Sequence, residues 1–367
     1  MSDTILLTGA TGFLGMETIA TLLAEDEGPD LLLAVRAADA AGAEERVREL
    51  LGRLYDRLPA SARRLRGIPA ELTAPGLGLS RANRAEVAGR VDRVVHCAAS
   101  ISFTLPLAEA RAINVDGTRA VLDLARDIPG LERVVHVSTA YVAGRTAGRF
   151  GEEDLDRGQS FRNTYEQTKW EAELVVRDAG LPAVVVRPSI VVGESGSGWT
   201  SAFNVIYWPL QAFVRGLLRS VPADPDGLVD LVGVDHVADL LVHAALAPGM
   251  TGTLHAVAGD GALRVRDLVA RASELLARPA PRLTPPGAIA AEDPAAVFAP
   301  YFDVRVAFDD RRARRALGRS APASEELLGA LLDYAQAARW GKRPLTREAA
   351  RASHRPPTRG EVRVLTL

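Results

Sequence analysis

Short runs of valine, isoleucine and leucine recur through the first half of the chain, and longer stretches of mixed polarity separate them. The runs lack strict alternation of apolar and polar residues, which is typical of strands buried on both faces of a parallel sheet. We predict strands at 4–8, 30–36, 91–99, 131–139 and 181–189, and helices at about 13–24, 44–57, 107–126 and 163–179. This β-α-β-α order predicts an α/β fold, a doubly wound parallel sheet covered by helices on both faces.

The pattern changes after residue 190. The segment "GESGSGWT" (193–200) is predicted to be a flexible polar loop, and an aromatic and apolar segment follows it. We expect the chain to return to the sheet within 227–259, and a proline-rich break at 279–287 then leads to a helical region. The last stretch, 346–367, has few apolar residues and is predicted to be loosely held.

These observations predict two parts of unequal size. Residues 1–190, with the returning segment 227–259, would form the larger, nucleotide-binding part. Residues 191–226 and 260–367 would form a smaller, mainly helical substrate-binding lobe and a C-terminal tail.

Composition excludes several classes of protein. The 367 residues include 47% hydrophobic and 25% charged residues with a net charge of −2, which is ordinary for a globular protein and gives no nucleic-acid footprint. No apolar run reaches membrane-spanning length, and no basic-then-apolar leader is visible. Cys97 is the single cysteine, so an intrachain disulfide is impossible and a cytoplasmic location is expected. The six histidines show no metal-ligand spacing, so we expect no metal site.

A glycine turn directly follows the first predicted strand. "LLTGATGFLG" places Gly9, Gly12 and Gly15 in a G-x-x-G-x-x-G spacing. A tight turn and a close approach of the backbone to a pyrophosphate both need glycine, and the next helix would point its amides at the phosphates. The alternative is a purely structural turn. Its position after the first strand of a parallel sheet favours nucleotide binding and a Rossmann-type fold.

The end of the second predicted strand bears on the choice of cofactor. An acidic residue there would bind the ribose 2′-hydroxyl of NADH, whereas arginine suits the 2′-phosphate of NADPH. This strand ends in Arg36, and Arg46 lies on the next helix. A surface arginine of no function is the alternative. The bidentate match of guanidinium and phosphate favours NADPH.

Lys169 is one of only two lysines in a chain rich in arginine, and it lies four residues after Tyr165. In a helix these two residues share one face. A lysine ammonium beside a tyrosine would lower the pKa of the phenol and make it a usable acid at neutral pH. The alternative is a solvated pair on a surface helix.

Taken together, the motifs resemble those of the extended short-chain dehydrogenases/reductases. "TGATGFLG", "HCAAS", "NVDGT", "VSTAY", "YEQTK" and "RPSIVVG" occur in that family's order over roughly residues 3–275. More narrowly, "HVSTAYVAG", "NTYEQTKWEAE" and "RPSIVVGESGSGWT" resemble the thioester reductases and fatty acyl-CoA reductases, which include the terminal reductase domains of carboxylic acid reductases and nonribosomal peptide synthetases.

The resemblance implies roles for individual residues. Tyr165 would be the proton donor with Lys169 as its partner, Thr139 would hold the substrate carbonyl oxygen, and Asn114 would organise the active-site helix. Glu71 stands where the family usually has an aspartate near the adenine. The cofactor-binding residues implied by the turn and the resemblance are Gly9, Thr11, Gly12, Phe13, Leu14, Gly15, Arg36, Arg46, Glu71, Leu72, Ala98, Ala99, Ser138, Tyr165, Lys169, Pro188 and Ser189.

Three functions remain open at this point. The first is an NADPH-dependent reductase that converts an acyl thioester, bound to CoA or to an acyl carrier protein, into an aldehyde, with onward reduction to the alcohol left open. The second is a sugar-nucleotide epimerase or hydroxysteroid-type dehydrogenase, and the third is a non-catalytic cofactor sensor. For the first, we expect part of the aromatic group Trp199, Phe203, Tyr207 and Trp208 to line an acyl pocket. Cys97, His96, His136 and His236 are expected to be packed or structural residues.

Overall fold

A seven-stranded parallel sheet forms the centre of the molecule in a computed structural model, which describes residues 3–203, 206–285 and 299–353. The order of its strands is β12-β7-β5-β4-β1-β2-β3, and every neighbouring pair runs parallel. The strands are β1 (Thr4–Thr8), β2 (Asp30–Val35), β3 (Leu65–Pro69), β4 (Arg93–His96), β5 (Arg133–Val137), β7 (Ala183–Pro188) and β12 (Gly252–Ala256). The predicted doubly wound sheet is therefore confirmed.

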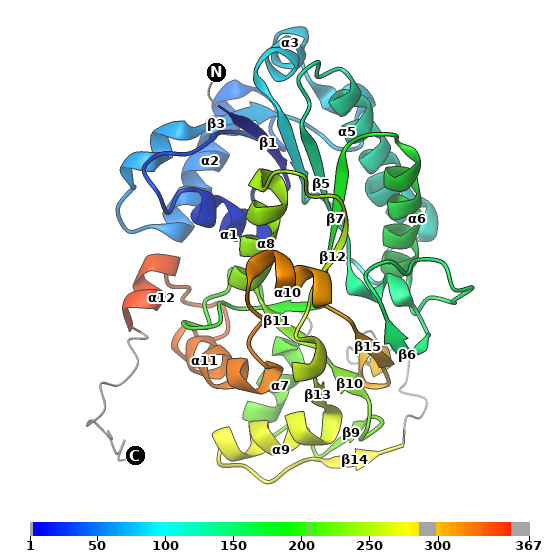
Figure 1. Cartoon of the computed structure of the whole chain (residues 1–367). Coiled ribbons are helices and arrows are strands. Elements are labelled where there is room, and N and C mark those ends of the chain that lie inside the picture. The colour runs from blue at the N-terminus through cyan, green and yellow to red at the C-terminus, as the bar shows by residue number, and fades with distance from the viewer. Residues whose placement is uncertain (1–2, 204–205, 286–298, 354–367) are drawn as a thin grey trace.

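Helices cover both faces of this sheet (Figure 1). One face carries α1 (Phe13–Leu22), α2 (Ala40–Leu54) and α8 (Val234–Leu246), and the other carries α3 (Arg81–Arg90), α5 (Gly117–Arg126) and α6 (Thr164–Asp178). Side chains of β1 alternate between the two layers, since Ile5 and Leu7 pack in the α1–α8 layer and Leu6 packs in the α5 layer. Burying each such side chain contributes about 1.5–3 kcal/mol relative to leaving it exposed.

The edge strand β3 was not predicted. Its sequence, "LRGIP", contains an arginine, a glycine and a proline, which all weaken a strand prediction. It forms because β2 offers it a free edge and because α2 packs on it. A Cβ at Gly67 would lie 2.9 Å from the backbone oxygen of Ala43, so close packing against α2 decides this residue.

A smaller lobe lies below the sheet in Figure 1. Its helices are α7 (Tyr207–Val214), α9 (Val265–Leu275) and α11 (Ser324–Ala337). Two further helices, α10 (Arg311–Leu317) and α12 (Arg347–Ser353), pack with Ala313 and Ala350 in the α1–α8 layer of the sheet. The strands of the lobe pair two by two: β6 (Ala147–Phe150) with β15 (Arg305–Phe308), β8 (Ile190–Val192) with β11 (Leu231–Gly233), β9 (Ser220–Pro222) with β14 (Arg282–Thr284), and β10 (Leu228–Val229) with β13 (Leu263–Arg264). The lobe has its own apolar core, which includes Phe150, Leu210, Phe213 and Leu328.

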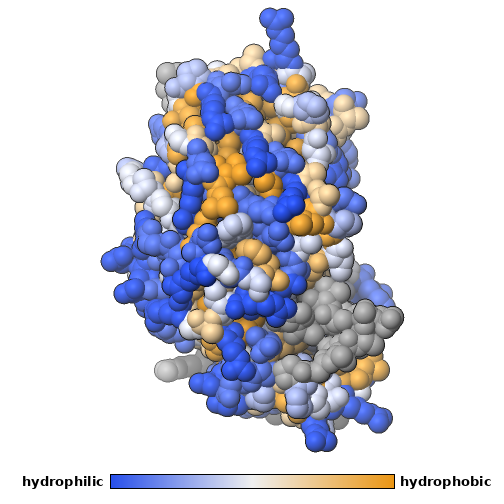
Figure 2. Space-filling model, turned by 90° about the vertical axis from the view of Figure 1, so that its right-hand side faces the viewer, coloured by the Kyte–Doolittle hydropathy of each residue, from blue (hydrophilic) through white to orange (hydrophobic). Residues whose placement is uncertain are grey.

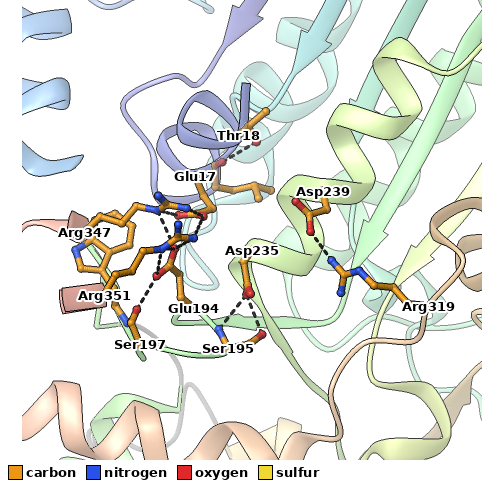
Figure 3. Close-up of polar contacts among 12 residues, drawn as sticks. Glu17, Thr18, Glu194, Ser195, Ser197, Asp235, Asp239, Arg319, Arg347 and Arg351 are labelled. Carbon is orange, nitrogen blue, oxygen red and sulfur yellow. Dashed lines mark hydrogen bonds and ion pairs between the residues drawn. The ribbon is translucent and has the colours of Figure 1, made fainter. Parts of the chain in front are cut away.

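The predictions that 193–200 is a flexible loop and that 346–353, the described part of the tail, is loosely held are both wrong. The same buried charges hold these two segments (Figure 3). Glu194, in the segment predicted to be a flexible loop, is 2% exposed and accepts hydrogen bonds from Arg351 and Ser197. Arg347, on α12 near the end of the chain, forms ion pairs with both Glu194 and Glu17 of α1. We call Glu17, Glu194, Arg347 and Arg351 the C-terminal clamp. Its charges hold both segments in place as far as residue 353, and residues 354–367 lie outside the described residues.

The face that shows α5 and α6 is mixed in character (Figure 2). Hydrophobic residues gather in its upper half between hydrophilic side chains, and hydrophilic residues dominate most of the rest. Among the described residues, no helix is both long and apolar enough to cross a membrane.

Candidate active site

The glycine turn joins β1 to α1 as the sequence predicts. Gly9 has a φ of +73°, and a Cβ there would lie 2.6 Å from the backbone nitrogen of Ala98. A Cβ at Gly15 would lie 2.2 Å from the oxygen of Gly9. These two glycines are therefore required by the packing of the turn itself. Gly12 caps α1 without a side-chain hydrogen bond, so it leaves the first-turn amides of the helix directed outward.

An open cleft of about 610 Å³ lies over this turn. Nine of the residues expected to bind a cofactor line it together: Gly9, Thr11, Gly12, Arg36, Arg46, Glu71, Leu72, Ala98 and Ala99. Ala98 and Ala99 follow β4 and line the cleft, where their small side chains leave space for a ligand. Backbone amides, two arginines and an elongated cleft fit a dinucleotide with its phosphates.

Arg36 forms an ion pair with Glu71 within this cleft. Its Nε lies 2.8 Å from Oε2 of Glu71, and the Arg36 side chain is 78% exposed. Burial acts to raise the pKa of the Glu71 carboxyl, but hydrogen bonds from Thr73 and the charge of Arg36 outweigh it and lower that pKa. A 2′-phosphate would therefore compete with Glu71 for the guanidinium.

Tyr165 lies in the first turn of α6, which begins at a well-capped position. Asn163 accepts a hydrogen bond from the backbone nitrogen of Glu166 and donates one to the hydroxyl of Tyr301. The ring of Phe103 lies between two tyrosines, 5.8 Å from Tyr165 and 5.1 Å from Tyr301 between centroids. Sequence reasoning missed Phe103 and Tyr301, because only the tertiary fold brings segments so far apart in the chain to one place.

The hydroxyl of Thr139 lies close enough to that of Tyr165 to lower the pKa of the phenol, so the structure brings these two predicted residues together. Thr139 also accepts from the backbone nitrogen of Tyr141 and donates to the carbonyl of Pro188. Thr139 is thereby fixed between the ends of β5 and β7.

The prediction that Lys169 lowers the pKa of Tyr165 is wrong when the side chains of the protein alone are considered. Burial raises the pKa of Tyr165 to about 12, and the nearby hydroxyl of Thr139 opposes this only in part. Lys169 is not directed at the phenol, since its Nζ donates to the backbone oxygen of Val137 at 2.7 Å. Tyr165 is consequently protonated at neutral pH, which is the state that a proton donor needs.

Lys169 is buried, with 2% of its surface exposed. Burial lowers the pKa of its ammonium to about 8, and the charge of Glu173 and the Cys97 thiol act in the opposite direction. Besides Val137, its Nζ has one contact at 3.4 Å with Nε2 of His136. Burial also raises the pKa of Cys97 to about 12, so this thiol is a poor nucleophile.

Asn114 is hydrogen-bonded to α6, the helix that carries Tyr165 and Lys169. It lies in a π-helical turn, Ala112–Asp116, that precedes α5. Its Nδ2 donates to Thr168 on α6 at 3.0 Å and to the carbonyl of Ser100 at 3.1 Å. Its Oδ1 accepts from the nitrogen of Ser100 at 2.8 Å. Asn114 thus ties α6 to the segment after β4.

The serines predicted to bind the cofactor direct their hydroxyls elsewhere. Ser138 donates to Glu173 at 2.5 Å, within a buried group in which Glu173 also binds Arg187. Ser189 donates to the buried carboxylate of Asp230 at 2.6 Å. Their hydroxyls therefore donate within the protein, and so do their backbone nitrogens, which bind the carbonyls of Val186 and Ala256. Pro188 ends β7 beside them, and Phe13 and Leu14 open α1.

The aromatic group expected to line an acyl pocket is mostly packed inside the protein. Trp199 is 1% exposed and lies 6.0 Å from Phe13 in the core of the sheet. Tyr207 is buried, and its hydroxyl accepts from the nitrogen of Gly193. A wholly apolar cavity does lie in the lobe, lined by other residues of the same segment and by α9: Ile206, Pro209, Leu210, Phe213, Leu218, Val221, Val265, Leu268, Val269, Ala272, Pro281 and Phe302.

Comparison with known proteins agrees with this arrangement. A glycine-turn cleft and a Thr–Tyr–Lys group at the carboxyl edge of a parallel sheet are typical of the extended short-chain dehydrogenases/reductases. Residues 7–241 match the family model described as male sterility protein. The chain belongs to this family.

Individual relatives are reductases and synthases. Fatty acyl-CoA reductase 1 of Homo sapiens is 34% identical over 283 residues, which cover 67% of this chain and 55% of that protein. Isonitrile lipopeptide synthase of Streptomyces coeruleorubidus is 34% identical over 66% of this chain and 17% of its own length. The chain thus spans about half the length of the fatty acyl-CoA reductases that it matches.

A solved structure covers nearly the whole chain. The terminal R domain from the myxalamid PKS-NRPS biosynthetic pathway is similar with a TM-score of 0.79 and 27% identity, over 94% of this chain and 93% of that one. The similarity includes both the sheet and the lobe.

Proposed function

We propose that the protein reduces an acyl thioester to an aldehyde with NADPH. The observation that carries the proposal is the closely placed Thr139–Tyr165 pair beside the cleft of the glycine turn, in a chain of the male sterility protein family. Arg36 and Arg46 would bind the 2′-phosphate, and the amides of the turn would bind the pyrophosphate.

The side chains of the site suit the reduction of a carbonyl. The bound nicotinamide would supply a hydride to the thioester carbon. Thr139 and Tyr165 would hold the carbonyl oxygen, and Tyr165 would transfer its proton to that oxygen as negative charge develops there. Collapse of the resulting hemithioacetal breaks the carbon–sulfur bond and releases an aldehyde and a free thiol. A second reduction of the aldehyde would give the alcohol.

The lobe supports an apolar acyl group as substrate. The cavity beside α7 and α9 has no polar lining residue, whereas a sugar nucleotide would need many polar contacts. Phe302 lines the cavity, and its neighbour Tyr301 packs on Phe103, which contacts Tyr165. These packed rings link Tyr165 to the lobe, so an acyl group held at Tyr165 would lie against apolar side chains. The thiol that carries it would belong to CoA or to an acyl carrier protein. The lone cysteine is compatible with the cytoplasmic location proposed for the protein.

The test measures the release of thiol together with the oxidation of NADPH. The protein is offered a panel of acyl-CoA and carrier-bound thioesters of different chain length, with a thiol-reactive dye and mass spectrometry of the products. We expect one thiol for each NADPH used to reach the aldehyde, and none with Tyr165→Phe. Oxidation of NADPH by simple ketones or aldehydes, with no thiol released from any thioester, would place the protein among the dehydrogenases instead.

A further inference from the structure

His136 is a buried histidine on β5 with an unusual set of contacts. It is 0% exposed, and its ring packs 5.4 Å from the ring of His96. Its Nε2 lies 3.4 Å from Nζ of Lys169, which is the one hydrogen-bond contact of this side chain among the described residues. Its Nδ1 is buried without a partner in the same part of the chain. A ring nitrogen left unsatisfied in a core costs stability, which sets His136 apart from a residue kept only for packing.

The neighbouring histidine shows what a purely structural ring looks like. His96 has a hydroxyl at each nitrogen, Thr8 at 2.7 Å from Nδ1 and Thr118 at 3.1 Å from Nε2. Thr118 donates its own hydrogen to the carbonyl of Asn114 at 2.6 Å. Nε2 of His96 must then be the donor and Nδ1 the acceptor, so both nitrogens are satisfied. His136, with one nitrogen aimed at a lysine and the other unpaired, is different.

We propose that His136 is a positioning residue for Lys169: its Nε2 and the carbonyl oxygen of Val137 together hold the lysine Nζ and leave the third hydrogen of the ammonium for a ligand. The inference rests on the role proposed above for Tyr165 and Lys169. An ammonium has three hydrogens and no acceptor, so two fixed acceptors on β5 set its direction. The carbonyl of Val137 alone, at 2.7 Å, would leave the ammonium free to rotate about one contact.

The charges around Lys169 agree with an accepting, neutral imidazole. Burial lowers the pKa of His136 well below its usual value, and the nearby Lys169 and His96 lower it further. A neutral ring can accept at Nε2 only as the Nδ1–H tautomer. Glu173 and Cys97 also face the lysine. Glu173 is engaged by Arg187 and Ser138, and Cys97 keeps its proton at neutral pH because burial raises its pKa to about 12. His136 is thus the neutral side-chain acceptor that faces the ammonium.

The composition of the chain allows a direct test. Lys169 and Lys342 are its only lysines, so selective isotope labelling of lysine gives two Cε signals in a nuclear magnetic resonance spectrum. Titration of the signal of Lys169 in the full-length protein without substrate gives its pKa. We expect about 8 in the wild type. In His136→Phe, which fills the space but cannot accept, the charged lysine loses one hydrogen bond, and its pKa should fall by about half to one unit.

Two further variants separate positioning from packing. His136→Gln offers an amide oxygen and should restore the titration of Lys169 to within a few tenths of a unit of the wild type. His236→Phe is the matched control, because His236 is another buried histidine, lies on α8, and its ring contacts Arg319 rather than Lys169 among the described residues. It should change stability without moving the signal of Lys169.

An unchanged titration of Lys169 in His136→Phe, or an equal shift in His236→Phe, would overturn the proposal. If His136→Phe does not fold, His136→Leu makes the same comparison with His136→Gln. The binding of NADPH, followed by fluorescence, should weaken several-fold in His136→Phe and recover in His136→Gln. Because the titration needs neither substrate nor turnover, it stands even if the protein proves not to reduce thioesters.

Discussion

Two groups of buried charge in this protein are built in opposite ways. The C-terminal clamp sets two carboxylates against two guanidiniums, with Arg347 Nε 2.8 Å from an oxygen of Glu17 and 2.8 Å from one of Glu194 (Figure 3). Lys169, by contrast, has no carboxylate within ion-pair distance among the described residues, and its contacts are the uncharged Val137 carbonyl and His136.

The difference decides what each group can do. A buried charge with a charged partner is held in place, and its removal leaves the partner unpaired. A buried ammonium without such a partner has its pKa drawn toward neutrality, here to about 8, and can respond to a ligand. We therefore expect the clamp to govern stability and Lys169 to govern activity. Each prediction below tests that division, from the largest expected effect to the smallest.

Replacing Tyr165 by phenylalanine removes the proposed proton donor and touches neither group of charges. Turnover should fall by about 10²- to 10⁴-fold, while thermal stability and NADPH binding stay close to those of the wild type. Tyr55→Phe, at the end of α2, is the matched control and should keep full activity. A Tyr165→Phe enzyme with more than a tenth of the wild-type rate would show that another group donates the proton.

Arg347→Ala should mainly destabilise the protein. The substitution leaves the carboxyl group of Glu17 buried without its partner Arg347. The free energy of unfolding should fall by about 3–5 kcal/mol. Urea unfolding of the variant measures this loss, and turnover per folded molecule should stay near that of the wild type. The double variant Glu17→Gln with Arg347→Met, which removes both charges, should recover part of the stability. A fall in turnover equal to that of Tyr165→Phe would link the clamp to catalysis and break the comparison.

Lys169→Met should show the reverse pattern. The apolar side chain fits a buried position and removes the cost of burying a charge, so the free energy of unfolding should not decrease. Turnover should nevertheless fall by about a hundredfold. Lys169→Arg, which keeps the charge, should also be strongly impaired because the planar guanidinium does not match the two acceptors on β5. Near-normal turnover in Lys169→Arg would show that any positive charge suffices.

Arg36→Ala tests a third kind of charge, an exposed one paired with Glu71. Such pairs contribute little to stability, so the free energy of unfolding should hardly change. The affinity for NADPH should fall by about ten- to hundredfold, and the affinity for NADH should change little. Titration of both cofactors against wild type and variant measures this. A wild type that prefers NADH would contradict the assignment.

Glu17 of the clamp and Lys169 should also make contributions to stability that change in opposite directions with pH. Burial raises the pKa of Glu17 from 4.5 to about 7, so its contribution to stability is lost as pH rises through that window. The pKa of Lys169 is lowered from 10.5 to about 8, so the unfolded chain binds the proton more tightly and stability rises from pH 8 to 10.5. Comparison with Glu17→Gln and Lys169→Met isolates each slope, which is at most about 1.4 kcal/mol per pH unit for one proton. Parallel slopes from both variants would refute the opposition.

Much of the larger half of the molecule could be predicted from the sequence. Strands such as Thr4–Thr8 and Ala183–Pro188 centre on the apolar runs 5–7 and 183–186, and a run buried on both faces carries its own signal. The glycine turn could also be predicted, because only glycine fits the positive φ at Gly9 and the close approach of the backbone at Gly15. The edge strand Leu65–Pro69 lacked such a signal.

Distance in the chain explains what could not be predicted. The clamp joins Glu17 to Arg347 across 330 positions, and a charged segment with few apolar residues gives no sign that a distant carboxylate will hold it. The contact of His136 with Lys169 likewise depends on how β5 packs against α6. The sequence by itself determined the sheet, the turn and the residue types of the site, because these follow from local patterns. Only the tertiary structure decided which charges are paired and which pKa values are shifted, because burial and partners are properties of the packed chain.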